Sequence, residues 1–161
     1  MDKHKSISVI IPAWNEAERI GLCLDSIARQ TVQPDEILIG VDACKDTLLE
    51  AERYVSDMVK VFNFDVNVGC YVIRNTLAMI AKGETLVFFD ADDTMHENFI
   101  SVMSGICEHG TVAKPLFYNV TGDQRVKFES PAMGCFAINK MDFVFCSGFE
   151  NWRIGADTEF H

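Results

Sequence analysis

The stretch Leu86-Val87-Phe88-Phe89-Asp90-Ala91-Asp92-Asp93 places four large apolar residues directly before three carboxylates. A short continuous apolar run of this kind is typical of a strand buried on both faces. In open α/β sheets, ligands bind at the carboxyl ends of such strands. Clustered carboxylates repel one another unless a cation or hydrogen-bond donors gather them. A divalent ion held by carboxylates and ligand phosphates would do so; a solvated acidic turn that caps the next helix is the alternative.

Outward from this stretch, strand and helix patterns alternate along the first half of the chain. Short buried runs predict strands at Ile7–Ile11, Glu36–Val41 and Val59–Phe64. Capping-box spacing predicts helices that begin near Asn15 (with Glu18) and Thr47 (with Glu50, ending at about Asp57). Gly69 introduces a third helix, which Lys82-Gly83 closes. The alternation predicts an α/β fold with a mostly parallel sheet flanked by helices.

The second half of the chain has a different pattern. Thr94 and Glu97 have capping-box spacing and predict a helix to about Glu108. The extended segments that follow indicate antiparallel or mixed strands added to the sheet: Val112–Val120, Arg125–Glu129 and Met133–Asn139. A short helix is expected at Lys140–Cys146, before an irregular tail. Because no linker or repeat interrupts the chain, residues 1–161 are expected to form one domain.

Composition narrows the classes of partner. The 161 residues include 24 acidic and 14 basic ones, a net charge of −10, so nucleic acid is not an expected partner. The apolar runs are too short to span a bilayer, and Met1–Lys5 precedes no apolar signal region, which predicts a cytoplasmic protein. The six cysteines form no CxxC pair and are expected to be reduced thiols.

Polar residues also follow the other predicted parallel strands. The first strand runs into Pro12-Ala13-Trp14-Asn15-Glu16, and the second ends at Asp42. Asp42 can accept hydrogen bonds from a base or ribose, and Arg74 can offset phosphate charge. Each has a structural alternative, since Asn15 can be a helix cap, Asp42 a turn residue and Arg74 a surface side chain.

Several motifs occur together in a recognisable order. They are Ser8-Val9-Ile10-Ile11-Pro12-Ala13-Trp14-Asn15-Glu16, Asn67-Val68-Gly69 through Arg74-Asn75 to Lys82-Gly83-Glu84, Asp90-Ala91-Asp92-Asp93, Gly134–Ile138, Ser147–Glu150 and Gly155–Phe160. Together they resemble the family 2 glycosyltransferases. The resemblance implies a GT-A (Rossmann-like) fold and inverting transfer of a sugar from a nucleotide-diphosphate sugar, with a UDP-sugar as the expected donor. The implied acceptor is a hydroxyl of a glycan, a lipid-linked or a small molecule, and the implied cofactor is Mn²⁺ or Mg²⁺.

The resemblance also implies residue roles. Pro12, Trp14 and Glu16 would line the nucleotide pocket, Asp42 would face the base or ribose, and Arg74 would lie near the diphosphate. Asp90 and Ala91 would contact the donor, Asp92 would ligate the metal and Asp157 would be the catalytic base. Residues 1–93 would then form the nucleotide-sugar half, and residues 94–161 the acceptor half.

Two departures from the family pattern leave other functions open. Asp42 is followed by Ala43-Cys44-Lys45 instead of an acidic and Gly-Ser-type turn, and Ala156 replaces the Glu of the Glu-Asp motif. The chain also stops four residues after Asp157. A non-catalytic nucleotide-sugar-binding module or inactive fragment is therefore the main alternative; a nucleotidyltransferase or a nucleic-acid-modifying glycosyltransferase fits less well. Four apolar residues near the tail fit either a homodimer contact or core packing: Phe143, Phe145, Phe149 and Trp152.

Overall fold

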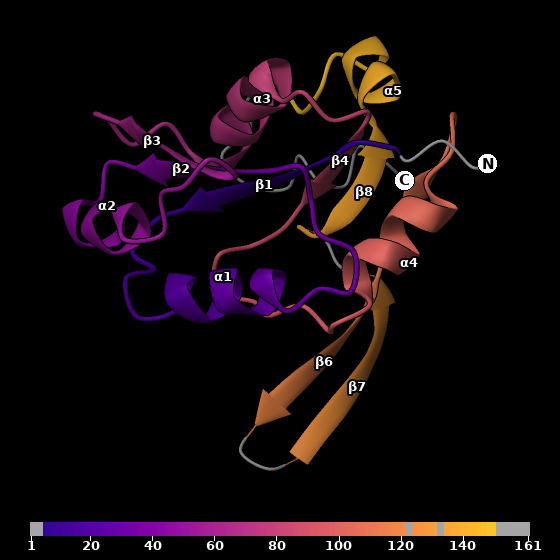
Figure 1. Ribbon diagram of the computed structural model, residues 1–161, viewed down its shortest axis with the longest axis horizontal. Coiled ribbons are helices and arrows are strands. Elements are labelled where there is room, and N and C mark those ends of the chain that lie inside the picture. Colours follow the sequence, from indigo (N-terminus) through magenta and orange to yellow (C-terminus); the bar gives the residue numbers. More distant parts are fainter. Residues whose placement is uncertain (1–4, 122–123, 132–133, 151–161) are drawn as a thin grey trace.

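The computed structural model describes residues 5–121, 124–131 and 134–150, with side-chain environments for residues 5–115 and 134–150. Within the described residues, six strands form one sheet in the order β3-β2-β1-β4-β8-β5 (Figure 1). The strands are β1 (Ile7–Ala13), β2 (Glu36–Asp42), β3 (Val59–Phe64), β4 (Thr85–Phe88), β5 (Val112–Ala113) and β8 (Phe136–Asn139). The first four are mutually parallel, and β8 runs antiparallel to β4 and β5. The predicted mostly parallel α/β sheet with antiparallel additions is confirmed.

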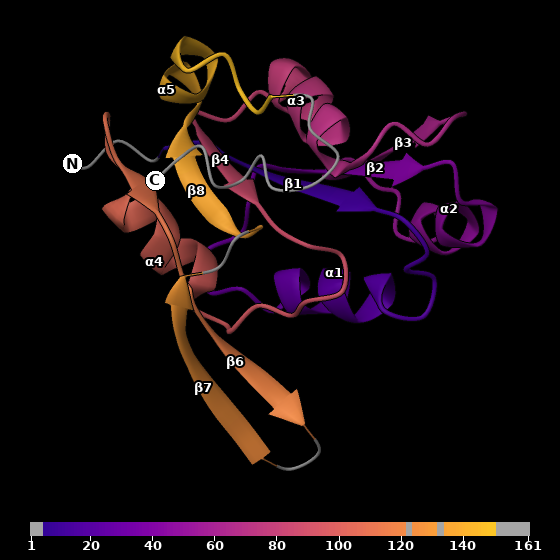
Figure 2. The same ribbon diagram turned by 180° about the vertical axis from the view of Figure 1, so that it is seen from behind.

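Alternating side chains of the strands build a core on each face of the sheet. Ile7, Val9 and Ile11 of β1 pack with helices α1 (Ile20–Ala28) and α4 (Phe99–Ile106), whereas Ile10 belongs to the opposite cluster. That opposite cluster contains residues of α3 (Cys70–Ile80) and α5 (Lys140–Phe145). The period of two along a strand produces this division. The sheet therefore lies between α1 and α4 on one side and α3 and α5 on the other (Figures 1 and 2).

The four strands predicted in the first half of the chain are confirmed to within two residues at each end. β3 has the predicted bounds, and β1 continues two residues past Ile11. The carbonyl of Ile10 accepts the Phe89 amide, so main-chain groups of even-numbered residues in β1 face β4. Because the β1–β4 pairing ends at Ile10 with Phe88, the missing N–H of Pro12 faces no ladder there.

The segments from 116 to 131 correct one expectation. β6 (Leu116–Thr121) and β7 (Gln124–Pro131) pair with each other as a separate two-stranded sheet instead of joining the main one. The hairpin extends away from the six-stranded sheet (Figure 2). The ladder between β5 and β8 ends at Ala113, and Pro115 has no amide N–H with which to extend this ladder.

The three predicted capping boxes were wrong about where helices begin. α1 begins at Ile20, because Asn15 has a left-handed φ of 59° and the Glu16 carbonyl accepts the amides of Arg19 and Ile20. α2 (Lys45–Glu52) begins before Thr47 and stops short of Asp57. α4 begins at Phe99. For Thr47 the reason is a tertiary contact, since its hydroxyl accepts the Glu16 amide at 2.9 Å.

Aromatic residues fill the core beneath α3 and α5. The rings of Phe136, Phe143 and Phe149 all lie within 5.4 Å, centroid to centroid, of the Phe88 ring. Phe143 and Phe149 therefore pack in the core, whereas Phe145 is 89% exposed. Trp152 lies outside the described residues. Among the helices of the described residues, none combines the length and hydrophobicity needed to cross a membrane.

Candidate functional site

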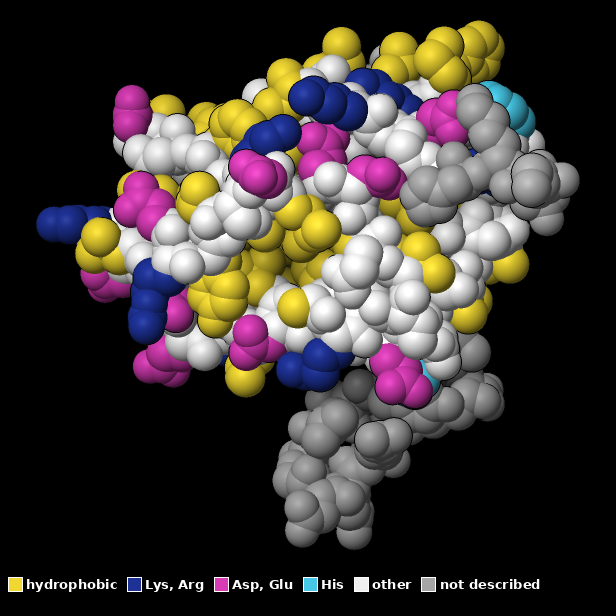
Figure 3. Space-filling model, in the orientation of Figure 1, with side chains coloured by type: hydrophobic (Ala, Val, Ile, Leu, Met, Phe, Trp, Pro, Cys, Tyr) yellow, Lys and Arg dark blue, Asp and Glu magenta, His cyan; other side chains and the backbone are white. Residues whose placement is uncertain are grey.

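The carboxyl ends of β1, β2 and β4 meet the start of α3 around a cleft of about 170 Å³. Its lining consists of Pro12, Ala13, Trp14, Glu16, Asp42, Cys70, Ile73, Asp90, Ala91 and Asp92. Of the site residues predicted from sequence that are described, Arg74 is the one missing from this lining. Figure 3 shows hydrophobic side chains in a hollow between α3 and α1, with acidic side chains along its upper edge. The fold thus gathers residues 78 positions apart in the chain, such as Pro12 and Asp90.

The end of β1 supplies one wall of the cleft. Pro12 and Ala13 are buried, whereas the Trp14 side chain is 61% exposed at the rim. The Glu16 carboxylate pairs with Arg19, with Nε to Oε2 at 2.7 Å. Burial raises the pKa of Glu16, Arg19 opposes this, and the negative charges of Asp92 and Asp90 add to the rise. An exposed aromatic ring beside a carboxylate is a suitable surface for a planar, hydrogen-bonding ligand.

Asp42 is buried and already holds the chain that leads into α3. Its Oδ1 accepts the Val68 amide at 2.8 Å, and its Oδ2 accepts the Gly69 amide at 3.0 Å and Asn67 Nδ2 at 2.9 Å. Gly69 has a φ of 89°, a conformation that favours glycine. Asp42 therefore shapes the cleft by fixing residues 67–69, and it leaves little acceptor capacity for a ligand.

Arg74 is buried and pairs with the first carboxylate of the acidic loop. Its Nη2 donates to Asp90 Oδ1, and its guanidinium carbon lies 5.7 Å from the ring centroids of both Tyr71 and Phe149. Its Nε has no hydrogen-bond partner among the described residues. A Cβ at Gly134 would lie 2.2 Å from Asp90 Oδ2, so glycine is needed there for the pair to form. Arg74 thus acts on the cleft through Asp90 and is not exposed to it.

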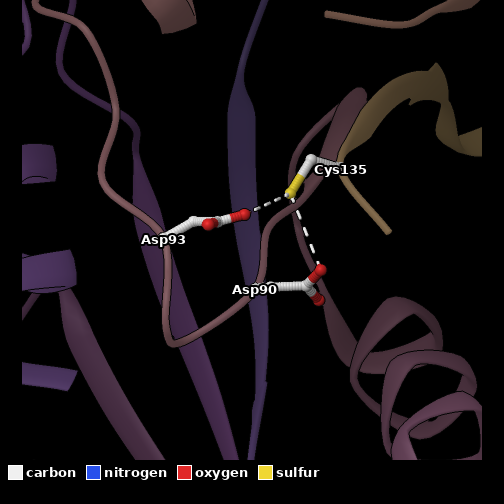
Figure 4. Close-up of side chains that lie close together, drawn as sticks. All are labelled: Asp90, Asp93 and Cys135. Carbon is white, nitrogen blue, oxygen red and sulfur yellow. Dashed lines mark hydrogen bonds between the residues drawn. The ribbon is translucent and has the colours of Figure 1, made fainter. Parts of the chain in front are cut away.

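The loop of residues 90–93 gathers negative charge. Burial, together with the charges of Asp92 and Asp90, raises the pKa of Asp93 to about 6. The Cys135 thiol lies between two carboxylates, 3.9 Å from Asp90 Oδ2 and 3.8 Å from Asp93 Oδ2 (Figure 4). Ligand atoms of Asp90, Asp93 and Cys135 lie within 4.8 Å of one another. This crowding is the condition under which a bound cation stabilises carboxylates.

Asp92, the predicted metal ligand, occupies a different position from that cluster. Its side chain is exposed on the cleft, and Oδ2 lies 3.5 Å from Arg19 Nη1. Burial raises the pKa of the Cys135 thiol well above its usual value, so the thiol stays protonated. Hard ions such as Mg²⁺ take oxygen ligands. The carboxylates of this loop, and not the thiol, are therefore the groups that suit Mn²⁺ or Mg²⁺.

Sequence reasoning gave no role to Cys135 or Asn67, and none to Asp93 beyond its place among the three clustered carboxylates. Asp93 stands in the quoted acidic motif, but the motif alone does not reveal that its carboxyl is partly buried. Cys135 is 42 residues away from Asp93 in sequence, and no local pattern links the two. Asp157 and Ala156 lie outside the described residues, so the predicted base stays a prediction.

Comparison with known proteins identifies relatives along nearly the whole chain. The sequence profile of glycosyl transferase family 2 matches residues 8–153. Glycosyltransferase AglE of Haloferax volcanii is 33% identical over 108 residues, 62% of this chain and 36% of AglE. The S. aureus TarS structure superposes with a TM-score of 0.74 at 20% identity, over 96% of this chain and 32% of TarS.

A second solved structure gives the same fold. The mannosyltransferase PcManGT of Pyrobaculum calidifontis, in complex with GDP-Man and Mn²⁺, superposes with a TM-score of 0.77 at 19% identity. That match covers 97% of this chain and 50% of PcManGT, so the chain spans half or less of the length of each of these three proteins. At these identities the structural likeness shows the GT-A fold. With the profile match over residues 8–153, it follows that the chain belongs to glycosyl transferase family 2.

Proposed function

We propose that this chain is the donor-binding and catalytic part of an inverting, metal-assisted glycosyltransferase that uses a nucleotide-diphosphate sugar. The observation that carries the proposal is the convergence of Trp14, Glu16, Asp90 and Asp92 from separate strand ends on one cleft. Ligands of parallel α/β sheets bind at this edge. Among structures with the same fold, TarS has been solved with UDP-GlcNAc and PcManGT with GDP-Man and Mn²⁺. The inverting course is taken from the family resemblance.

A divalent ion fits the acidic loop on physical grounds. Three carboxylates stand within four residues, and burial together with the charges of Asp92 and Asp90 raises the pKa of Asp93 to about 6. We assign the principal ligand to Asp92, because its carboxylate is exposed on the cleft where donor phosphates would complete the coordination. When bound, the ion would offset the negative charge that develops on the departing diphosphate.

The chain's own residues would orient the donor and activate the acceptor. Trp14 and Glu16 would hold the nucleotide at the rim of the cleft, and Arg74 would keep Asp90 in place. Inverting transfer needs an acceptor hydroxyl that attacks the anomeric carbon opposite the diphosphate. A carboxylate within hydrogen-bond reach can remove the hydroxyl proton during attack, and the resemblance gives this role to Asp157.

A non-catalytic nucleotide-sugar-binding module is the second candidate. Ala156 in place of the motif's Glu is the observation that favours it. Such a module would share the cleft and the acidic loop but would not turn over. Turnover, and not binding, therefore separates the two functions.

The donor site is tested by calorimetric titration of the protein with UDP, GDP, CDP and dTDP, each with and without Mn²⁺. The proposal expects one nucleotide, UDP in the first instance, to bind with clear dependence on Mn²⁺. Absence of binding to all four would contradict it. The sugar conjugates of the nucleotide that binds then become the substrates for assays of nucleoside-diphosphate release.

Asp157→Asn tests the catalytic half of the proposal. We expect transfer to fall by about 10²–10⁴-fold, the usual contribution of a general base, while the nucleotide affinity changes little. The measurement pairs nucleoside-diphosphate release with the calorimetric dissociation constant. Equal loss of turnover and binding would reject Asp157 as the base, and wild-type protein that binds but never turns over would favour the non-catalytic module.

A further inference from the structure

The Asn75 side chain forms hydrogen bonds with both the main-chain amide and the main-chain carbonyl of Phe149. Its Oδ1 accepts the Phe149 amide at 2.9 Å, and its Nδ2 donates to the Phe149 carbonyl at 2.7 Å. The two residues are 74 positions apart. A side-chain amide that satisfies both main-chain groups of one residue fixes that residue as a strand partner would.

The turn before Phe149 is shaped for this contact. Gly148 has a φ of 69°, and a Cβ there would lie 2.6 Å from Asn75 Oδ1. Ser147 is also left-handed, with a φ of 66°. The close approach of the main chain to Asn75 therefore depends on glycine at position 148. Beyond the turn, the Phe149 ring is buried among Tyr71, Phe88, Phe136 and Phe143.

Arg74, the neighbouring residue of the same helix, is linked to the cleft through Asp90. Arg74 donates to Asp90 and lies 5.7 Å from the Phe149 ring, so one side chain separates Phe149 from the acidic loop. At the start of α3, the amides of Val68 and Gly69 donate to the Asp42 carboxylate. α3 is thus bound at its start to β2, through Arg74 to the acidic loop, and through Asn75 to the turn at Gly148-Phe149.

We propose that Asn75 is a positioning residue that fixes the start of the segment carrying Asp157 relative to the donor cleft. The inference rests on the proposed function, because it concerns how the base-bearing segment is aligned with the donor. Asn75 touches no lining residue of the cleft through the contacts described above, so its effect is on alignment and not on donor affinity. Small misplacements of reacting groups cost rate more than they cost binding.

The test compares Asn75→Ala with Thr76→Ala on the full chain. Thr76 is the next residue of α3, is exposed, and bonds only to the Val72 carbonyl of its own helix among the contacts in the described residues. Two readouts are taken for each variant. Amide hydrogen exchange at Phe149 is followed by NMR, and nucleoside-diphosphate release and the calorimetric affinity for the nucleotide with Mn²⁺ are measured in parallel.

We expect Asn75→Ala to speed exchange of the Phe149 amide at least about 10-fold, because its acceptor is removed. Turnover should fall about 10- to 100-fold, with the nucleotide dissociation constant within about threefold of wild type. Thr76→Ala should match wild type in all three measurements. Should Asn75→Ala fail to fold, Asn75→Asp replaces it, because its carboxylate can still accept the Phe149 amide but repels the Phe149 carbonyl instead of donating to it. For that variant the fall in turnover, and not the exchange rate, is the test.

Four results would overturn the inference. Unchanged exchange at Phe149 in Asn75→Ala would show that Asn75 does not hold it. Faster exchange with turnover equal to that of Thr76→Ala would show that the contact does not align catalysis. Wild-type protein that binds nucleotide but releases none from any conjugate would reject the proposed function, and the positioning role with it. An active wild type with an Asn75→Ala variant equal to the control would reject only the positioning role.

Discussion

Two acidic regions at the same edge of the sheet differ in how far the chain itself balances their negative charge. Asp42, at the end of β2, is buried with three donors from residues 67–69 on its carboxylate. The loop of residues 90–93, after β4, holds three carboxylates whose nearest cations in the described residues are Arg74 and Arg19. The chain itself satisfies the first region, whereas the second retains unbalanced charge.

This difference distinguishes a carboxylate that the chain itself satisfies from carboxylates that remain available to a ligand, a distinction that sequence position alone does not make. A carboxylate that accepts main-chain amides contributes to stability and is hard to divert to a ligand. Crowded carboxylates raise the free energy of the folded protein until a cation binds. We therefore expect substitutions at Asp42 to change mainly stability, and substitutions in the 90–93 loop to change mainly binding of metal and donor.

The largest effect is expected from Asp42→Ala. Loss of the carboxylate strips three donors of their acceptor, so the free energy of unfolding should fall by about 3–5 kcal/mol. Denaturant titration followed by circular dichroism measures the change. A variant as stable as wild type, with lost nucleotide binding, would mean that Asp42 is a ligand contact and would reverse the comparison.

Asp92→Ala should affect binding instead. Its side chain is exposed, so the stability should stay within about 0.5 kcal/mol of wild type. The Mn²⁺-dependent part of nucleotide affinity should be lost, roughly 30-fold for an interaction of about 2 kcal/mol. Calorimetry with and without Mn²⁺ provides the measurement. Unchanged affinity would reject Asp92 as the metal ligand.

The pH dependence of stability should show the burial of Asp93 and its crowding by Asp92 and Asp90. The pKa of Asp93 is raised to about 6 in the folded protein and is near 3.9 when unfolded, so the protonated form is favoured by folding. Its contribution is present below about pH 4 and is lost as the pH rises through about 6. Asp93→Asn should flatten this part of the profile and add about 1 kcal/mol at pH 7, since the side chain keeps some solvent contact. Denaturant unfolding at a series of pH values from 4.5 to 7.5 would show it; an identical profile for the variant would exclude Asp93 as the source.

The smallest effect is expected from Arg19→Gln. Arg19 lies 3.5 Å from Asp92 and competes with a cation for it, but both side chains are about half exposed. The Mn²⁺ dissociation constant should fall by no more than about fivefold, as for other exposed pairs. Titration of Mn²⁺ in the presence of nucleotide measures it. Weaker Mn²⁺ binding would indicate that Arg19 helps to hold the phosphates.

Much of the fold could be predicted from patterns in the sequence. The bounds of β3 and the start of α3 after Gly69 agree with the structure, because burial period and glycine conformation are local properties. The helix starts at Asn15, Thr47 and Thr94 were predicted wrongly, because contacts with distant residues override the local capping pattern. The Thr47 hydroxyl, for example, accepts a hydrogen bond from the Glu16 amide, 31 residues away, instead of capping its own helix.

The residues that line the cleft could also be predicted from the sequence, but the burial and hydrogen-bond partners of each side chain could not. Parallel strands end at one edge, so Pro12, Asp42 and Asp90 had to be neighbours. That Asp42 is saturated by amides, or that Arg74 is buried under Asp90 and Phe149, depends on contacts across 16 to 75 residues. No local period encodes such contacts.

The sequence by itself determined the alternation of elements, the acidic loop after a buried strand and the order of motifs that marks the family. These follow from local chemistry: side-chain period, glycine and proline geometry, and the spacing of charges. Only the tertiary structure decided which carboxylates are satisfied by the chain, which cysteine lies among them, and how Asn75 holds Phe149. Those outcomes depend on burial and on donors brought from distant segments, and both exist only once the sheet and its helices have packed.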